Sequence, residues 1–231
     1  MTVFFRSPIH LDIVSDVVCP WCIIGFKQLE KALIETDLTA DITWHPFELN
    51  PHMEPQGENL REHTAAKYGT TTEGSAKARA RITEMGEELG FEFKYADDMR
   101  MYNTFMAHQL LHWAATKGLQ HELKMELFSA FFTHRLHIGD PNVLASTAGN
   151  IGLDLQEALA ILEDGRFAED VRQNQKYWTN RGVSGVPAII INQKHLVSGA
   201  QGVENYVSVL KQVNEELQSI EDGKTAAEES L

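Results

Sequence analysis

The two cysteines of this 231-residue chain, Cys19 and Cys22, are separated by only two residues, and no other cysteine is present. An apolar segment of strand length, residues 9–15, precedes them, and residues 23–34 carry apolar side chains at helical spacing. The residue after Cys19 is a proline, which the first turn of a helix tolerates because its missing N–H would have no partner there. The pattern therefore predicts that the pair lies where a strand turns into a helix.

Cys19 is expected at the N-terminus of that helix. Free backbone N–H groups and the positive end of the helix dipole then point at its sulfur, and both stabilise a thiolate relative to a thiol. We therefore expect a lowered pKa for Cys19 and an ordinary one for Cys22. One turn of helix also brings Cys22 close enough to form a disulfide with Cys19.

A pair of cysteines at this spacing has two other interpretations. A zinc site needs further ligands, and the sequence holds no second cysteine pair. His108 and His112 have the spacing of a ligand pair, but Gln109 stands where a zincin motif has glutamate. A structural disulfide across so short a loop would constrain the unfolded chain little. A redox-active dithiol without metal is the favoured interpretation.

The charge of the chain limits its partners and its location. With 33 acidic and 20 basic residues the net charge is −13, which argues against nucleic acid or an anionic membrane as a partner. No run approaches the ~18 apolar residues of a membrane helix, and residues 1–8 lack the pattern of a secretory signal. We expect a cytoplasmic protein, and there a close pair of cysteines is more often catalytic or redox-sensing than structural.

The segment from Asp16 to Cys22, followed by Ile24 and Gly25, resembles the active-site motif of the DsbA family of thioredoxin-like proteins, in particular its cytoplasmic FrnE-like branch. Four further segments look like other signatures of that branch: residues 44–51, 103–108, 182–187 and 198–201. They occur in the order of the family and cover nearly the whole chain. The resemblance implies an α/β protein, a thioredoxin fold with a large all-helical insertion between the second and third strands.

The order of elements along the chain agrees with that fold. Four segments have strand-like patterns: residues 9–15, 41–47, 188–192 and 195–198. From residue 58 to 181 we find helical patterns and no convincing strand, and residues 203–217 form an amphipathic helix. We therefore predict a thioredoxin-fold domain made of residues 8–56 and 182–220, an inserted helical domain of residues 57–181, and a disordered acidic tail of residues 221–231.

The resemblance also implies how a substrate is held. The bond between Val186 and Pro187 would be cis and would lie beside the cysteines, so that the N–H and C=O of Val186 could pair with an extended substrate. Without the resemblance, a trans proline that begins a strand would be the ordinary interpretation. Pro20 and Trp21, between the cysteines, are expected to form an apolar rim that contacts the substrate.

A buried acid stands six residues before the first cysteine in thioredoxins and DsbA, and that position here is Ile13. Asp12 is one residue out of phase and should face the other side of the strand. Asp16 is the nearest candidate for handling a proton, although orienting the turn is the more ordinary role of an aspartate there.

Three further residues are candidates for the substrate groove: Asn103, His108 and Gln201. The first two are five residues apart on one predicted helix, so they point in directions more than about a hundred degrees apart, and at most one should face the groove. A helical histidine such as His108 is more often a surface residue or a satisfied polar one. His134 and His137 are expected to be solvated.

These observations favour a thiol–disulfide oxidoreductase in which Cys19 is the nucleophile and Cys22 the resolving thiol. No cofactor is expected; a glutathione or thioredoxin system would recycle the pair, and glutathione could serve as co-substrate. Two rival functions are considered. The first is a glutathione-dependent isomerase or transferase of the 2-hydroxychromene-2-carboxylate isomerase (kappa-class) type, which usually has serine in place of Cys19. The second is a non-catalytic binding or chaperone module, with an inert Cys19 and a large exposed apolar groove. The substrate, the direction of electron flow and the choice between monomer and homodimer stay open at this point.

Overall fold

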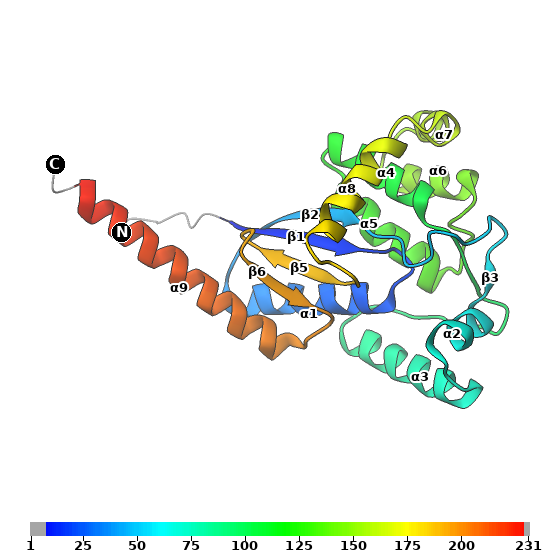
Figure 1. Cartoon of the computed structure of the whole chain (residues 1–231), viewed down its shortest axis with the longest axis horizontal. Coiled ribbons are helices and arrows are strands. Elements are labelled where there is room, and N and C mark those ends of the chain that lie inside the picture. The colour runs from blue at the N-terminus through cyan, green and yellow to red at the C-terminus, as the bar shows by residue number, and fades with distance from the viewer. Residues whose placement is uncertain (1–7, 229–231) are drawn as a thin grey trace.

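Strand β1 (Ile9–Ser15) is the central strand of the computed structural model, which describes residues 8–228. Ile9, Leu11 and Ile13 are buried on one face and Val14 on the other, as expected for a strand that is covered on both sides. β1 pairs in parallel with β2 (Ala40–Pro46) and antiparallel with β5 (Ala188–Ile191), which pairs antiparallel with β6 (His195–Ser198). The resulting order β2-β1-β5-β6 is that of a thioredoxin fold (Figure 1).

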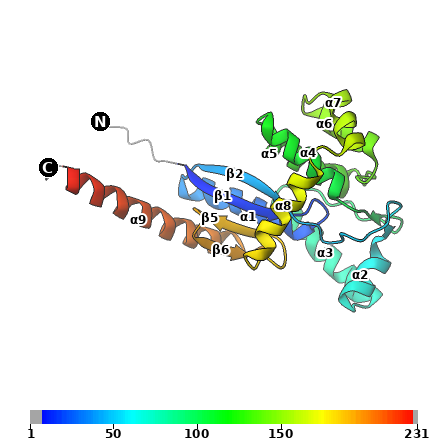
Figure 2. The ribbon, with the colours of Figure 1, turned by 45° about the horizontal axis from the view of Figure 1, so that its top comes forward.

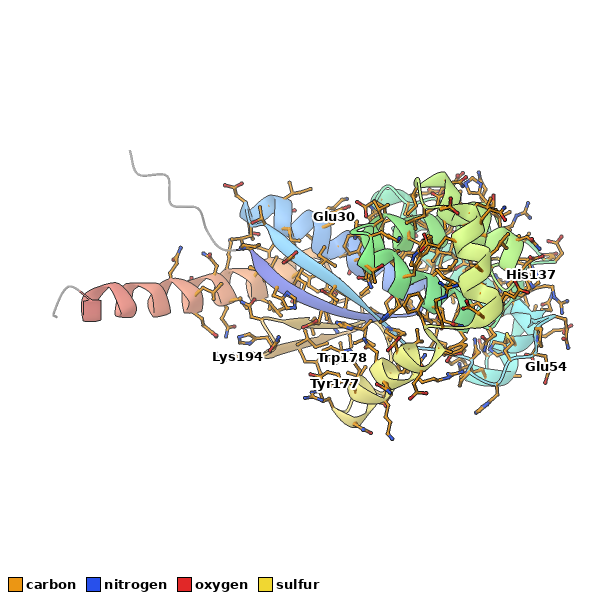
Figure 3. The ribbon with its side chains drawn as sticks, turned by 90° about the horizontal axis from the view of Figure 1, so that it is seen from above. Glu30, Glu54, His137, Tyr177, Trp178 and Lys194 are labelled. Carbon is orange, nitrogen blue, oxygen red and sulfur yellow. The ribbon has the colours of Figure 1, made fainter. Side chains whose placement is uncertain are left out.

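Helices cover both faces of this mixed sheet. Helix α1 (Pro20–Thr36) and helix α9 (Val203–Glu228) pack against each other along one face. Helix α8 (Ala168–Asn180) lies over the other face, where its Trp178 belongs to the cluster of buried side chains around Val14. Figure 3 places Glu30 of α1 and Tyr177 of α8 on opposite sides of the strands.

The chain between β2 and β5 forms a helical insertion at one end of the sheet, opposite to the end from which α9 projects (Figure 2). Before α8 it contains α2 (Leu60–Tyr68), α3 (Thr72–Glu88), α4 (Phe105–Thr116), α5 (Gln120–Phe128), the π-helical turn η1 (Ser129–Thr133), α6 (Pro141–Asn150) and α7 (Leu155–Asp164). Asp140 and Asp154 cap α6 and α7 by accepting backbone N–H groups at 2.7 Å, as aspartates at helix N-termini commonly do. None of the helices described between residues 8 and 228 is long and apolar enough to cross a membrane.

One helix of the insertion is fixed to the free edge of the sheet by a side-chain amide. Gln120, at the start of α5, accepts the N–H of Trp44 at 2.9 Å and donates to the carbonyl of Trp44 at 3.0 Å. The amide thus occupies the backbone groups of β2 that another strand would otherwise occupy. This contact sets the position of α5 relative to β2.

Two predictions need correction. The insertion contains a short antiparallel pair, β3 (Glu58–Asn59) and β4 (Arg100–Met101), where no strand was predicted; two residues are too few to show an alternating pattern. Helix α9 continues to Glu228, so residues 221–228 are helical rather than a disordered tail. Several residues of this segment favour helix, and lengthening an existing helix needs no new nucleus. Residues 229–231 of the predicted tail lie outside the described part of the chain.

Candidate active site

The cysteine pair lies at the start of α1, as predicted. Cys19 is the N-cap residue, Pro20 follows in the first turn, and the N–H of Cys22 donates to the carbonyl of Cys19 at 3.1 Å. Both cysteines are free thiols and both are largely buried, with exposed fractions of 4% for Cys19 and 1% for Cys22. Cys19 is therefore the sulfur that is nearer to solvent.

The outer wall of the site is the loop before β5. The Val186–Pro187 peptide bond is cis, and the carbonyl oxygen of Val186 lies 3.7 Å from the sulfur of Cys19. The loop lines a shallow groove of about 330 Å³, together with Ala188, Leu196, Ser198 and Gly199. A side chain at Gly25 would come within 3.2 Å of the Pro187 ring, so glycine allows this loop to approach α1 closely. The groove therefore begins beside the more accessible thiol.

The two residues between the cysteines differ in exposure. Trp21 is 39% exposed, which is high for so large an apolar side chain, and Pro20 is partly buried. An exposed indole next to Cys19 fits the predicted rim of the site.

The inner wall of the site contains Asp16, whose side chain is fully buried. Its Oδ2 accepts the N–H of Leu49 at 2.7 Å, and its Oδ1 lies 3.5 Å from Nε2 of His108. Burial acts to raise the pKa of Asp16, but His108, the Leu49 N–H and the charge of Lys124 outweigh burial, so the pKa is lowered. Asp16 is thus held as a carboxylate beneath the cysteines.

His108 is buried, so of the two alternatives expected for it, a surface residue or a satisfied polar one, the structure shows the second. It is 3% exposed, and its Nε2 lies 3.1 Å from the carbonyl oxygen of Phe47. The burial of His108 comes from a tertiary contact and not from its position on the helix, because the loop after β2 packs on this face of α4. His112, its neighbour on α4, is partly exposed and lies 4.0 Å from Asp170, so the two histidines have different partners.

Lys124 is a site residue that the sequence reading missed. It lies on α5 with its side chain completely buried, and its ammonium has no hydrogen-bond partner among residues 8–228. The nitrogen lies 5.2 Å from the centre of the Trp44 ring and 4.9 Å from that of Phe128. Burial lowers the pKa of Lys124 to about 8, with the charges of the two cysteines and Asp16 acting in the opposite direction. At neutral pH the ammonium is therefore the main form.

A signal for Lys124 was present in the sequence. Lys124 and Phe128 are four residues apart and so lie on one face of α5, within the apolar stretch that includes Leu123 and Leu127. A lysine within an apolar helical face can lie at the edge of the core with its ammonium in solvent, or it can be fully buried beside compensating charges. The sequence pattern alone did not distinguish these two cases.

The pKa values of the two thiols differ from the prediction. A hydrogen bond with Cys22, followed by burial, raises the pKa of Cys19 well above its ordinary value. Burial also acts to raise the pKa of Cys22, but hydrogen bonds from Cys19 and Ser15 and the charge of Lys124 outweigh burial and lower it. The first negative charge of the pair therefore forms on Cys22, with Cys19 as its hydrogen-bond donor. The helix-start argument failed because the hydrogen bond between the two thiols raises the pKa of Cys19 and lowers that of Cys22, and the charge of Lys124 adds to the lowering. The side chain of Cys19 also makes no capping hydrogen bond.

Two predicted groove residues are engaged elsewhere. The amide of Asn103 donates to Oε2 of Glu48 at 3.2 Å, and its oxygen accepts the N–H of Phe105 at 2.9 Å, so it braces the loop after β2 from the start of α4. Gln201 is exposed and donates to the carbonyl of Ser198, on its own loop. We assign neither side chain a direct part in the site.

The described part of the chain holds no group of three or more histidine, cysteine, aspartate or glutamate side chains that could bind a metal ion. His137, expected to be solvated, is instead partly buried, and its ring centre lies 4.0 Å from that of Tyr102. His134 is exposed as expected. What the site offers chemically is therefore a pair of thiols between an open groove and a set of buried charges.

Comparison with known proteins gives a consistent result. The family model described as a DSBA-like thioredoxin domain matches residues 10–211. The uncharacterized protein YwbO of Bacillus subtilis (strain 168) is 29% identical over 195 residues, which are 84% of this chain and 92% of that protein. The crystal structure of the probable DsbA oxidoreductase SCO1869 from Streptomyces coelicolor has a TM-score of 0.84 and 28% identity, and the match covers 90% of this chain and 91% of that one. A 2-hydroxychromene-2-carboxylate isomerase shares the fold, with a TM-score of 0.67, 12% identity and coverage of 91% and 98%.

Proposed function

This chain belongs to the DSBA-like thioredoxin domain family, and on that basis we propose that it is a thiol–disulfide oxidoreductase that works through Cys19 and Cys22. The observation that carries the proposal is the arrangement of the pair. Two free thiols lie within one turn of helix; Cys19 lies beside the groove at Val186, and the charge of buried Lys124 acts on Cys22. The pair ionises first at Cys22, and a thiolate is the species that attacks a disulfide.

The reaction proceeds in two exchanges. A proton passes from Cys19 to the Cys22 thiolate, and the resulting Cys19 thiolate attacks one sulfur of the substrate disulfide. A mixed disulfide forms, and the second substrate sulfur leaves as a thiolate. Cys22, once deprotonated, then attacks the sulfur of Cys19, which closes the Cys19–Cys22 disulfide and releases the remaining substrate sulfur. Two electrons pass to the substrate, and the reverse sequence oxidises a dithiol.

Substrate recognition in this proposal relies on backbone and on apolar contact. The carbonyl of Val186 lies beside Cys19, and the groove of residues 182–187 accommodates an extended chain that pairs with it. Pro20 and Trp21, next to Cys19 in the chain, would add apolar contacts with the substrate. Since the described groove offers few charged side chains, we propose that it accepts disulfides of varied sequence. Glutathione or a thioredoxin system in the cytoplasm would return the pair to its working state.

The glutathione-dependent isomerase expected as a rival is kept, because a 2-hydroxychromene-2-carboxylate isomerase shares this fold. What favours the oxidoreductase is the second cysteine. An enzyme that only activates bound glutathione needs no resolving thiol, whereas here Cys22 is buried within a turn of Cys19 and is polarised by Lys124.

Replacement of Cys22 by serine separates the two functions. Intramolecular attack by Cys22 has a high effective concentration and normally shortens the life of the mixed disulfide. The Cys22→Ser variant should therefore accumulate adducts on Cys19 after exposure to oxidised glutathione, and a reductant should release them. Mass spectrometry of the intact protein measures the adduct.

The matched control is Cys19→Ser, which keeps the buried thiol and removes the accessible one. This variant should stay unmodified. A Cys22→Ser protein that remains unmodified and keeps isomerase-type activity with glutathione would overturn the proposed function.

A further inference from the structure

The helical insertion delivers a cation to the interior of the active site. Gln120 fixes the first turn of α5 to the backbone of Trp44, and Lys124 follows one turn later on the same face of that helix. Its side chain therefore points under the sheet edge, toward Trp44, rather than into solvent. The thioredoxin part of the chain supplies the thiols, and the insertion supplies the charge.

The surroundings of this ammonium are unusual. A buried ammonium is costly unless it is paired or hydrogen-bonded, yet the Lys124 nitrogen has no hydrogen-bond partner among the described residues. Oδ1 of Asp16 is likewise without a hydrogen bond. The charges that act on Lys124 are those of Cys22, Asp16 and Cys19, in that order. The ammonium is thus compensated by the charges of the site rather than by a hydrogen bond of its own.

Lys124 also lines an internal cavity of about 180 Å³ between β2 and helices α4, α5 and α8. The titratable side chains that line the cavity with it are His45 from β2 and His108 and His112 from α4. Carboxylate charge comes from Asp16, which His108 contacts. The cavity is large enough for a few water molecules, and these could solvate the ammonium of Lys124.

We propose that Lys124 is a positioning residue of the active site: its ammonium stabilises the negative charge that the cysteine pair carries in the reduced state. The inference rests on the proposed function and adds to it the residue that sets the redox balance of the pair. Because the thiolate exists only in the reduced form, a cation beside it favours that form and makes the disulfide more oxidising. An ordinary structural ion pair with Asp16 would not have this consequence.

The test is Lys124→Met, which keeps the length of the side chain and removes the charge. The pH dependence of alkylation by iodoacetamide, followed on the reduced protein, reports the apparent pKa of the pair. We expect it to rise by about one unit, so that about tenfold less thiolate is present below that pKa. The equilibrium with reduced and oxidised glutathione should shift toward the protein disulfide by up to the same factor, or about 30 mV.

Stability provides a second readout. Methionine packs well against the rings of Trp44 and Phe128, but removing one partner of a buried set of charges is destabilising, because the buried carboxylate of Asp16 remains. Lys124→Met should therefore unfold at a lower urea concentration than the parent protein and also show the shifted thiol titration. A purely structural role predicts lost stability with an unchanged thiol titration, and that result would overturn the inference.

Two variants complete the design. Lys211→Met removes a lysine from the exposed side of α9 and should leave the titration unchanged. If Lys124→Met does not fold, Lys124→Gln replaces it, and an unshifted titration in that variant overturns the inference as well. Since alkylation needs no disulfide substrate, a shifted titration in a protein without exchange activity would contradict the proposed function and still support the role of Lys124.

Discussion

Two aspartates four residues apart, Asp12 and Asp16, form acid–histidine clusters of opposite character. On the α8 side of the sheet, Oδ1 of Asp12 contacts Nε2 of His45 at 2.8 Å, and Nδ1 of the same ring lies 3.2 Å from the amide oxygen of Asn174. Beneath the cysteines, Oδ1 of Asp16 has only a 3.5 Å contact with His108 and no hydrogen bond.

The difference indicates which cluster is structural and which is functional. Polar groups in a protein interior are normally hydrogen-bonded, and those that are not need an explanation. Both ring nitrogens of His45 have a close partner, so the Asp12 cluster joins β1, β2 and α8. In the Asp16 cluster, Oδ1 of Asp16 and the ammonium of Lys124 have no hydrogen bond. The charge of Asp16 acts on Cys19, and the charge of Lys124 acts on Cys22.

The largest effect in this comparison is expected from Asp16→Asn. Asparagine can still accept the N–H of Leu49, but it leaves Lys124 without a carboxylate, and we expect a loss of about 1–3 kcal/mol in the free energy of unfolding. Because the pKa of Asp16 is lowered in the folded state, its stabilisation is complete above the pKa of the unfolded chain, about 4, and is lost as the pH falls through the folded value. Urea unfolding at several pH values measures the difference.

The same variant should lower the apparent pKa of the cysteine pair, because a negative charge near the thiols is removed. This shift is opposite to that expected for Lys124→Met. A stability difference that stays constant down to acidic pH, or a titration shifted in the same direction in both variants, would mean that these charges do not act as described.

A smaller effect is expected from Asp12→Asn. The amide can still contact His45, which keeps its second partner Asn174, so we expect a loss of about 1 kcal/mol in the free energy of unfolding. The alkylation profile of the cysteines should be unchanged, since Asp12 lies on the other side of β1. If this variant shifted the thiol titration as much as Asp16→Asn does, the distinction between the clusters would have to be abandoned.

The smallest effect is expected from His45→Gln, and it concerns pH. Burial lowers the pKa of His45 although Asp12 acts against burial, so the folded protein holds the neutral ring. Stability is then unaffected above the pKa of the unfolded chain, about 6.5, and falls as the pH drops from there toward the folded value. His45→Gln should reduce this fall by roughly 1 kcal/mol or less.

Thermal unfolding between neutral and mildly acidic pH measures the change. His10→Gln removes a nearby charge that also lowers the pKa of His45, so it should reduce the pH dependence in the same direction and by less than His45→Gln does. Equal pH dependence in the parent protein and in His45→Gln would count against a buried neutral ring.

Local sequence patterns predicted the face of the sheet on which Asp12 lies, but not the partners of either cluster. Alternation along β1 correctly placed Asp12 on the face opposite to Ile13, and the proline after Cys19 marked the start of α1. What local patterns could not supply were contacts between distant segments. His108 is buried because Phe47 and Asp16 meet it, and Lys124 is buried because Gln120 fixes α5 to Trp44.

The thiol pKa values illustrate the same limit. A helix N-terminus is visible in the sequence, and it predicts activation of Cys19. The cation that favours charge on Cys22 comes from an insertion residue about a hundred positions away, and no short-range pattern indicates that it points at the site. The contact between the two thiols, together with a smaller contribution from this cation, therefore favours the negative charge on Cys22 rather than on the sulfur at the helix start.

The pairing of Leu11 with Ile191 has a kinetic consequence, since the two residues lie near opposite ends of the chain. Contacts between residues so distant in sequence close large loops, which slows folding. During synthesis both cysteines leave the ribosome long before Val186, and the central strand waits for its antiparallel partner until the insertion has been made. We therefore expect the nascent chain to expose two unprotected thiols for much of its synthesis, and the groove beside them to form only in its last stage.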